Sequence, residues 1–178
     1  AGMSWHELGP DNIGGRTRAI EPFSTGSSMN GLYAGSVSGG LWKSTNRGDN
    51  WTQITTFPNL MVASIALAGN GDLYVGTGSN WEGGGGEGSS GFRGEGIYRS
   101  TDSGASWELV SGSGNFDATD AIEPDPNNDN RVWFASTSGY GSITEGELTT
   151  VNVSTAFSGG SDIAIAPDGS YCLVAETN

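Results

Sequence analysis

Two polar turns that each lead into a tryptophan decide the fold: STNRGDNWTQI at Ser44–Ile54 and STDSGASWELV at Ser100–Val110. A short strand-like segment precedes each turn, GLWKS in the first copy and GIYRS in the second. Serine and Asp or Asn side chains in such turns accept hydrogen bonds from backbone N–H groups, and glycine adopts positive φ without a clash. We therefore expect two compact turns whose tryptophans, Trp51 and Trp107, occupy equivalent and buried positions.

Further strand-like segments recur along the chain, and this recurrence predicts a repeated unit of four strands. The units begin near residues 18, 64, 120 and 163, a spacing of roughly 40–55 residues that suits the blades of a β-propeller. The expected blades cover residues 16–54, 62–110, 119–154 and, for the start of a fourth, 161–178, with 5–10 forming an outer strand that closes a blade. We predict an all-β chain with about three and a half four-stranded antiparallel blades, to which the same gene or another chain adds the rest.

Composition and charge limit the classes of partner. The 31 glycines, 6 Trp, 5 Tyr and 6 Phe favour many turns between short strands. The 20 acidic residues outnumber the 7 basic ones, for a net charge of −13, so nucleic acid is not an expected partner. No apolar run approaches the length of about 18 residues that would predict a membrane span. The single cysteine, Cys172, lies in the apolar run YCLVA and is expected to be buried.

The polar turns resemble the Asp box, whose pattern is Ser-x-Asp-x-Gly-x-(Ser/Thr)-Trp. The second copy matches this pattern in full, at Ser100, Asp102, Gly104 and Trp107. The first copy has Ser44, Asn46, Gly48 and Trp51, and it departs from the pattern at Asn46 and Asn50. The resemblance to BNR/Asp-box propellers, which include sialidases and sortilin-type domains, implies a propeller fold. Because an Asp box is a structural device, the resemblance implies no catalytic activity by itself.

Longer stretches resemble a narrower group of proteins: WHELGPDNIGGRTRAIEP, LYAGSVSGGLWKSTNRGDNW and the segment ending in GEGIYRSTDSGASW. They look like the start of large extracellular propeller proteins of Bacteroidetes-type bacteria, many of which use the type IX secretion system. This resemblance covers roughly residues 4–110 and implies an exported protein, extracellular or on the cell surface. The sequence contains no sorting domain of that system, which we interpret as a truncated chain.

The sharpest catalytic candidate is GGRTRAI, which contains Arg16 and Arg18. In the sialidases that these repeats resemble, an arginine on the first inner strand helps to bind the substrate carboxylate by bidentate pairing. The Arg-Ile-Pro motif of that family is absent, and a structural or rim role for both arginines is the preferred interpretation. A glycoside hydrolase, sialidase-like or other, whose site is completed by missing blades is therefore the alternative to a non-catalytic module.

One segment exceeds what the blade pattern requires, GSNWEGGGGEGSSGFRGEG at 78–96. Loops of that length are functional or disordered, and strand alternation predicts this one on the face opposite the polar turns, near Arg16 and Arg18. Trp81 and Phe92 on such a loop either stack on a sugar ring, anchor a partner protein, or pack back onto the blade. We therefore predict a non-catalytic extracellular module that binds a glycan or a surface or secretion protein, with the arginines favouring an acidic sugar.

Calcium is the ion with most support, from the oxygen donors Glu123, Asp125 and Asp129 in EPDPNNDN. These residues lack the spacing of a calcium-binding loop, and they fall where neighbouring units have hairpin turns. A solvated β-turn is the preferred interpretation, and no cofactor is expected. The single histidine, His6, lies beside Trp5 on an expected edge strand and is not expected to act as a base or ligand.

Overall fold

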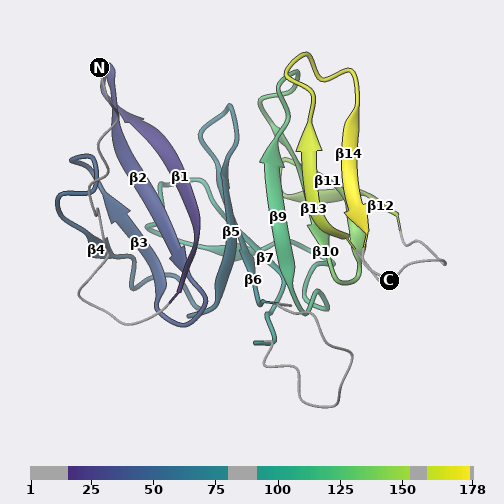
Figure 1. Ribbon diagram of the computed structural model, residues 1–178, viewed down its shortest axis with the longest axis horizontal. Helices are drawn as coiled ribbons and strands as arrows, with labels where there is room; N and C mark the ends of the chain where they lie inside the picture. Colours follow the sequence, from purple (N-terminus) through teal and green to yellow (C-terminus); the bar gives the residue numbers. More distant parts are fainter. Residues whose placement is uncertain (1–15, 80–91, 153–159, 177–178) are drawn as a thin grey trace, which may run out of the picture.

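The structure is a computed structural model that describes residues 16–79, 92–152 and 160–176. In these ranges it is all-β, with three four-stranded antiparallel sheets and one two-stranded sheet (Figure 1). Blade 1 holds β1 (Thr17–Thr25), β2 (Ser28–Ser36), β3 (Gly40–Ser44) and β4 (Thr52–Gln53). Blade 2 holds β5 (Val62–Leu67), β6 (Leu73–Thr77), β7 (Ile97–Ser100) and β8 (Glu108–Leu109). Blade 3 holds β9 (Thr119–Pro124), β10 (Arg131–Ser136), β11 (Gly139–Thr144) and β12 (Glu147–Asn152), and a last pair holds β13 (Gly160–Ile165) and β14 (Cys172–Glu176).

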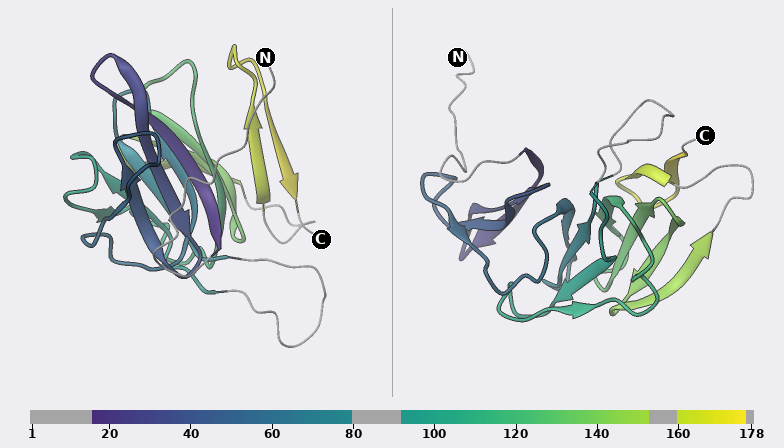
Figure 2. Two further views of the ribbon diagram at one scale, coloured as in Figure 1. Left: turned by 60° about the vertical axis from the view of Figure 1, so that its left-hand side comes forward. Right: turned by 90° about the horizontal axis from the view of Figure 1, so that it is seen from below.

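The strands of each sheet follow one another in chain order, so each blade is a simple meander. The first strands of the blades lie side by side, because β5 packs between β1 and β9 while β13 packs against β9. Figure 2 shows the sheets following one another along an open arc, with β13 and β14 at its end. The expected propeller fold, present in part, is confirmed: the described sheets form an arc and not a closed ring.

The core lies between successive blades. The second strand of each complete blade buries one aromatic side chain almost fully: Tyr33 on β2, Tyr74 on β6 and Phe134 on β10. Phe116, from the link between blades 2 and 3, stacks on Phe134 with ring centroids 5.3 Å apart. Full burial of one such side chain stabilises the fold by roughly 1.5–3 kcal/mol, so these aromatics explain how a glycine-rich chain holds its blades together.

Small residues beside these aromatics let neighbouring blades approach closely. A Cβ at Gly35 would clash with Val62 on β5, and a Cβ at Gly76 would lie 2.8 Å from the Thr119 Cβ on β9. Blade 3 has Ala135 at the same position, and it is fully buried in a cluster with Ile163. The recurring segments LYAGS, LYVGT and VWFAS therefore each supply one fully buried aromatic and one small residue for blade contact, with the buried aromatic of the third, Phe134, one position later than Tyr33 and Tyr74.

Two burial predictions differ from the structure. Trp51 and Trp107 are only partly buried, because each lies where its polar turn enters the outermost strand of a blade. The ring of Trp107 still packs edge-on against Phe57, 4.8 Å away. Cys172 is exposed, because β14 pairs with β13 on one side and no other described strand covers it.

Residues 5–10, expected to form a closing outer strand, and His6 within them lie outside the described residues. The described ranges contain no helix, and hence none long and apolar enough to cross a membrane.

Candidate functional site

An open groove lies between blades 1 and 2, at the end of the molecule where the inner strands begin. It has a volume of about 410 Å³ and is lined by Val37, Ser38, Pro58, Asn59, Leu60, Met61, Phe92 and Glu95. Leu60 and Phe92 expose 60% and 50% of their surface, which is unusual for large apolar side chains. Ligand pockets commonly measure about 300–1,000 Å³ and combine apolar walls with a few polar groups, and this groove matches both properties.

Backbone hydrogen bonds fix the three segments that line the groove. Gly40 N in the β2–β3 turn donates to Leu60 O at 2.9 Å, which ties that turn to the β4–β5 link. Gly78 N donates to Met61 O at 3.2 Å, which ties the link to the end of β6. Ser79 and Phe92 exchange two backbone bonds of 2.8 and 3.1 Å. The exposed apolar side chains therefore stand on a fixed frame, so binding would require little ordering of the backbone.

The polar corner of the groove consists of Asn59, Glu95 and Tyr98. Glu95 Oε2 accepts hydrogen bonds from Asn59 Nδ2 at 3.4 Å and from Tyr98 Oη at 3.3 Å. Burial raises the pKa of Tyr98, and the neighbouring Glu95 carboxylate raises it further. Asn59 is buried, and its Oδ1 accepts the Met61 N–H at 2.8 Å, which directs the Asn59 amide nitrogen toward Glu95.

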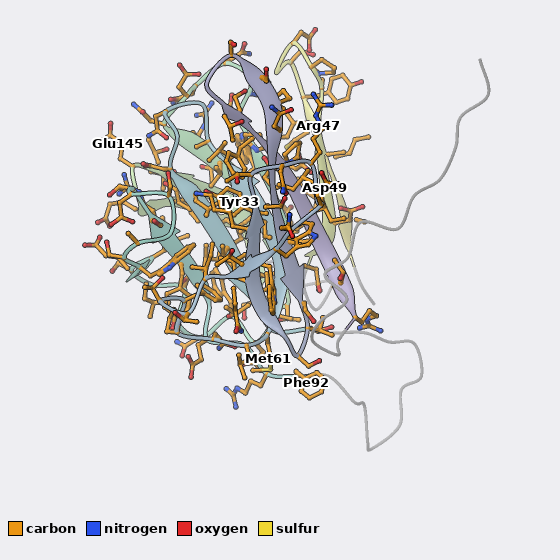
Figure 3. All side chains as sticks on the ribbon, turned by 90° about the vertical axis from the view of Figure 1, so that its left-hand side faces the viewer. Tyr33, Arg47, Asp49, Met61, Phe92 and Glu145 are labelled. Carbon is orange, nitrogen blue, oxygen red and sulfur yellow. The ribbon has the colours of Figure 1, made fainter. Side chains whose placement is uncertain are left out.

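The groove lies away from the polar turns. Figure 3 shows Met61 and Phe92 at the lower end of the molecule, whereas Arg47 and Asp49 of the first polar turn lie well above them. Strand alternation explains this separation, because the β2–β3, β4–β5 and β6–β7 connections emerge opposite the β3–β4 and β7–β8 turns. Ser79 and Phe92, within the predicted 78–96 loop, lie on the expected face.

The turn at Ser100 is held by its own side chains. Gly104 N donates to Ser100 Oγ and Ser106 N donates to Asp102 Oδ1, each at 2.8 Å. Gly104 has φ of 95°, a conformation that strains any residue with a Cβ. Hydrogen bonds from Ser106, through its hydroxyl and its backbone, lower the pKa of Asp102 to about 2, and a bond from Ser100 contributes.

The turn at Ser44 has the same geometry despite its different sequence. Gly48 N donates to Ser44 Oγ at 2.9 Å, and Asn50 N donates to Asn46 Oδ1 at 2.9 Å. Gly48 has φ of 91°. Asn46 thus accepts the same backbone bond as the aspartate of the second copy, because that bond needs an oxygen and not a charge.

Arg18 connects three blades beside the groove. Its guanidinium donates to Ser79 Oγ at 3.1 Å and forms an ion pair with Asp120 at 2.8 Å, where the Asp120 side chain is 5% exposed. Ser79 in turn pairs with Phe92. Asp120 therefore balances the charge of Arg18 within the protein. Of the two arginines expected to attract an acidic sugar, Arg18 is thus already in an ion pair.

Three carboxylates on the inner strands β1, β9 and β13 influence one another. Burial raises the pKa of Glu21 on β1 to about 7, a hydrogen bond from Leu67 N opposes the rise, and Glu123 on β9 adds to it. Burial and the charge of Asp162 on β13 raise the pKa of Glu123. A carboxyl group whose pKa lies near 7 can serve as a general acid, so Glu21 has an acidity compatible with that role.

The turn at 123–130, expected to be a solvated β-turn, is held by hydrogen bonds, but its central aspartate is buried and not solvated. Asp125 is buried, with Oδ2 accepting from Arg131 at 2.8 Å and from Trp133 Nε1 at 2.7 Å. Its Oδ1 accepts the Asn127 N–H at 2.8 Å. These bonds lower the pKa of Asp125 despite its burial and occupy the oxygens that a cation would need. Across residues 16–79, 92–152 and 160–176, no group of three or more acidic, histidine or cysteine residues could hold a metal ion.

The structure brings together only part of the predicted binding set. Phe92 lines the groove, and Arg18 lies behind it in an ion pair. The Arg16 carbonyl accepts the Val37 N–H at 3.1 Å, next to the groove. Trp81 lies outside the described residues.

Sequence reasoning missed every described lining residue except Phe92; four of those missed give the groove its apolar and polar character, Asn59, Leu60, Met61 and Glu95. The first three belong to the short segment FPNLM, where an apolar pair follows Pro-Asn before the next strand begins. Pro-Asn is a turn signal, and apolar residues that directly follow a turn and precede the next strand can be exposed. This pattern was the sign in the sequence that Leu60 and Met61 could lie on the surface. Glu95 gave no such signal, since it is one of 20 acidic residues.

No family model matches this chain. A probable oligoxyloglucan-reducing end-specific xyloglucanase from Neosartorya fischeri is 34% identical over 117 residues, which cover 62% of this chain and 12% of that protein. Among solved structures, an ancestral GH74 enzyme gives a TM-score of 0.69 at 25% identity, covering 90% of this chain and 22% of that one.

The extracellular domain of a protein described as a hybrid two-component system from B. thetaiotaomicron gives a TM-score of 0.65 at 16% identity. That match covers 96% of this chain and 21% of the other. These solved structures are β-propeller proteins, which agrees with the blades described above. The chain spans only about an eighth of the curated relative's length.

Proposed function

We propose that this chain is part of an extracellular propeller module that binds a glycan in the groove between blades 1 and 2 without cleaving it. The observation that carries the proposal is the groove itself, in which exposed Leu60 and Phe92 stand beside Asn59 and Glu95. Apolar and aromatic side chains pack on the C–H faces of sugar rings, and amide and carboxylate groups bond their hydroxyls. The lining thus offers both kinds of contact that a sugar requires.

The relatives support a glycan and suggest which one to try. The curated relative is named as a xyloglucanase, and one structural neighbour is a GH74 enzyme. We therefore propose xyloglucan-type oligosaccharides as the first ligands to test. The extracellular domain among the neighbours supports an exported protein. The hydrogen-bonded turns at Ser44 and Ser100 support membership of the BNR/Asp-box propellers, and a Bacteroidetes-type surface protein exported by type IX secretion remains part of the proposal.

Hydrolysis is the second candidate function, and the raised pKa of Glu21 is the observation that favours it. Glycosidases use two carboxyl groups on either side of the scissile bond. Among the described residues, Glu95 is the carboxylate that lines the groove, and Glu21 belongs to a separate place on the inner strands. Binding therefore fits the described site better than cleavage, which would need a second carboxylate from outside the described residues.

Calorimetric titration with xyloglucan oligosaccharides tests the proposal. Phe92→Ala should weaken binding by roughly two- to tenfold, because an aromatic packing contact is worth about 0.5–1.5 kcal/mol. Tyr171→Ala is the matched control, since Tyr171 is an equally exposed aromatic in the β13–β14 turn at the other end of the blades. Equal affinity of both variants and the wild type would remove the groove as the site. Release of reducing sugar that depends on Glu21 would favour the hydrolase, and binding of proteins but no glycan would refute a glycan ligand.

A further inference from the structure

The charge of the groove is one-sided. Glu95 lines it, and the eight described lining residues include no lysine or arginine. The nearby cation Arg93 is itself paired with Asp117 at 2.8 Å. Arg18 is paired with Asp120. A ligand in the groove therefore meets one lining carboxylate and, among the described lining residues, no cation, in a protein whose net charge is −13.

Hydrogen bonds to both the backbone and the side chain of Glu95 hold it in position. Its backbone N–H donates to Thr77 Oγ1 at 2.8 Å, which anchors it at the end of β6. Its Oε2 receives the bonds from Asn59 and Tyr98 already described. No donor among the described residues reaches Oε1, so this oxygen can accept a hydrogen bond from a ligand. Glu95 thus combines an available acceptor with a negative charge held in place.

We propose that Glu95 makes the groove selective for neutral glycans and excludes glycans that carry carboxylates. The inference rests on the proposed glycan-binding function and replaces the acidic sugar expected from Arg16 and Arg18. A neutral sugar hydroxyl can donate to Oε1, and hydrogen bonds to a charged acceptor are the stronger kind. A uronate at the same place offers a carboxylate instead, which cannot donate when ionised and is repelled by Glu95.

The expected size of the discrimination follows from Coulomb's law. Two like charges about 5 Å apart, in surroundings with a dielectric constant of about 40–80, reduce affinity by roughly four- to twentyfold. Salt screens such an exposed pair, so the discrimination should shrink as ionic strength rises from about 0.02 to 0.5 M. A steric cause of discrimination would not respond to salt in this way.

The test compares two oligosaccharides that differ only at one C6 position: cellohexaose and a form in which a single glucose is oxidised to the uronate, titrated into the full protein at pH 7. The wild type should bind cellohexaose roughly four- to twentyfold more tightly than the uronate form. Glu95→Gln keeps the shape and an acceptor oxygen but removes the charge, and should bring the two affinities within about twofold. Glu108→Gln, an exposed glutamate on β8 outside the groove, is the matched control and should discriminate like the wild type.

The outcomes separate the two proposals. If neither oligosaccharide nor xyloglucan fragments bind the wild type, the glycan-binding function itself is wrong, and selectivity fails with it. If the wild type binds both forms equally, or if Glu95→Gln discriminates as strongly as the wild type, Glu95 does not select the ligand although the groove still binds glycans. Tighter binding of the uronate form would overturn the inference directly.

Discussion

Replacement of Glu21 by glutamine should make the protein more stable above pH 7 and leave it nearly unchanged near pH 4.5. Burial and the neighbouring Glu123 raise the pKa of Glu21 to about 7 in the folded protein, from 4.5 ordinarily. Because the folded pKa is the higher one, the stability contributed by this group is complete below about pH 4.5. It is lost as the pH rises through 7, where a buried carboxylate must ionise beside another carboxylate.

The magnitude follows from the size of the pKa shift. A shift from 4.5 to about 7 corresponds to at most about 3 kcal/mol, and solvent screening of the partly exposed side chain reduces this to about 1–2 kcal/mol. The glutamine keeps an oxygen to accept the Leu67 N–H, now 3.2 Å from Glu21 Oε1. Urea unfolding followed by tryptophan fluorescence should therefore give Glu21→Gln an advantage of about 1–2 kcal/mol at pH 8.

The control for this measurement is Glu108→Gln, which changes the same charge at an exposed position on β8. It should alter the free energy of unfolding by less than about 0.5 kcal/mol at either pH. A Glu21→Gln advantage that does not vary between pH 4.5 and 8, or a variant less stable than the wild type at pH 8, would refute the reasoning.

Three further experiments, with five substitutions, test the turns and the ion pair that joins the blades. Asp102→Ala should lower the thermal midpoint at pH 7, whereas Asp102→Asn should lower it less, because Asn46 makes the same backbone bond in the first turn. Because the pKa of Asp102 is lowered to about 2, its stabilising effect should be complete above pH 3.8 and disappear as the pH falls through 2. Equal thermal midpoints for Asp102→Ala and Asp102→Asn at pH 7 would contradict the role given to the backbone bond. Gly104→Ala should cost about 1–2 kcal/mol in urea unfolding because φ is 95° there, and no loss would argue against the turn. Arg18→Met should cost about 3 kcal/mol because Asp120 is 5% exposed, and adding Asp120→Asn should recover part of it; no recovery would mean that the ion pair is not the cause.

The repeated local patterns made the propeller fold predictable from the sequence. The turns at Ser44 and Ser100 form through bonds between residues only two to four positions apart, so their sequences suffice to specify them. The aromatic and small residues of LYAGS, LYVGT and VWFAS recur on the second strand of each blade, β2, β6 and β10. Such signals depend on local geometry alone, which a single sequence records well.

The candidate site was less predictable because its residues meet across blades. Phe92 could be found as an aromatic in a long glycine-rich loop, whereas Leu60 lies in the link between two expected blades, 16–54 and 62–110, and was not singled out. The Arg18–Asp120 ion pair joins residues separated by 102 positions, and no local pattern indicates such a partner. Cys172 was predicted to be buried from its apolar neighbours, yet its exposure depends on whether another strand covers β14. Whether two distant residues form an ion pair, and whether a strand is covered by another, depends on the tertiary structure. Neither can be derived from local sequence patterns or from composition.

A crystal structure of the full protein with a xyloglucan oligosaccharide is the most direct test of glycan binding in the groove. Binding in the groove should give density for a sugar ring packed against Phe92 and Leu60, with a ring hydroxyl within about 3.2 Å of Glu95 Oε1. Density on the face that carries the Ser44 and Ser100 turns, or crystals without bound sugar at concentrations that saturate binding in solution, would contradict it.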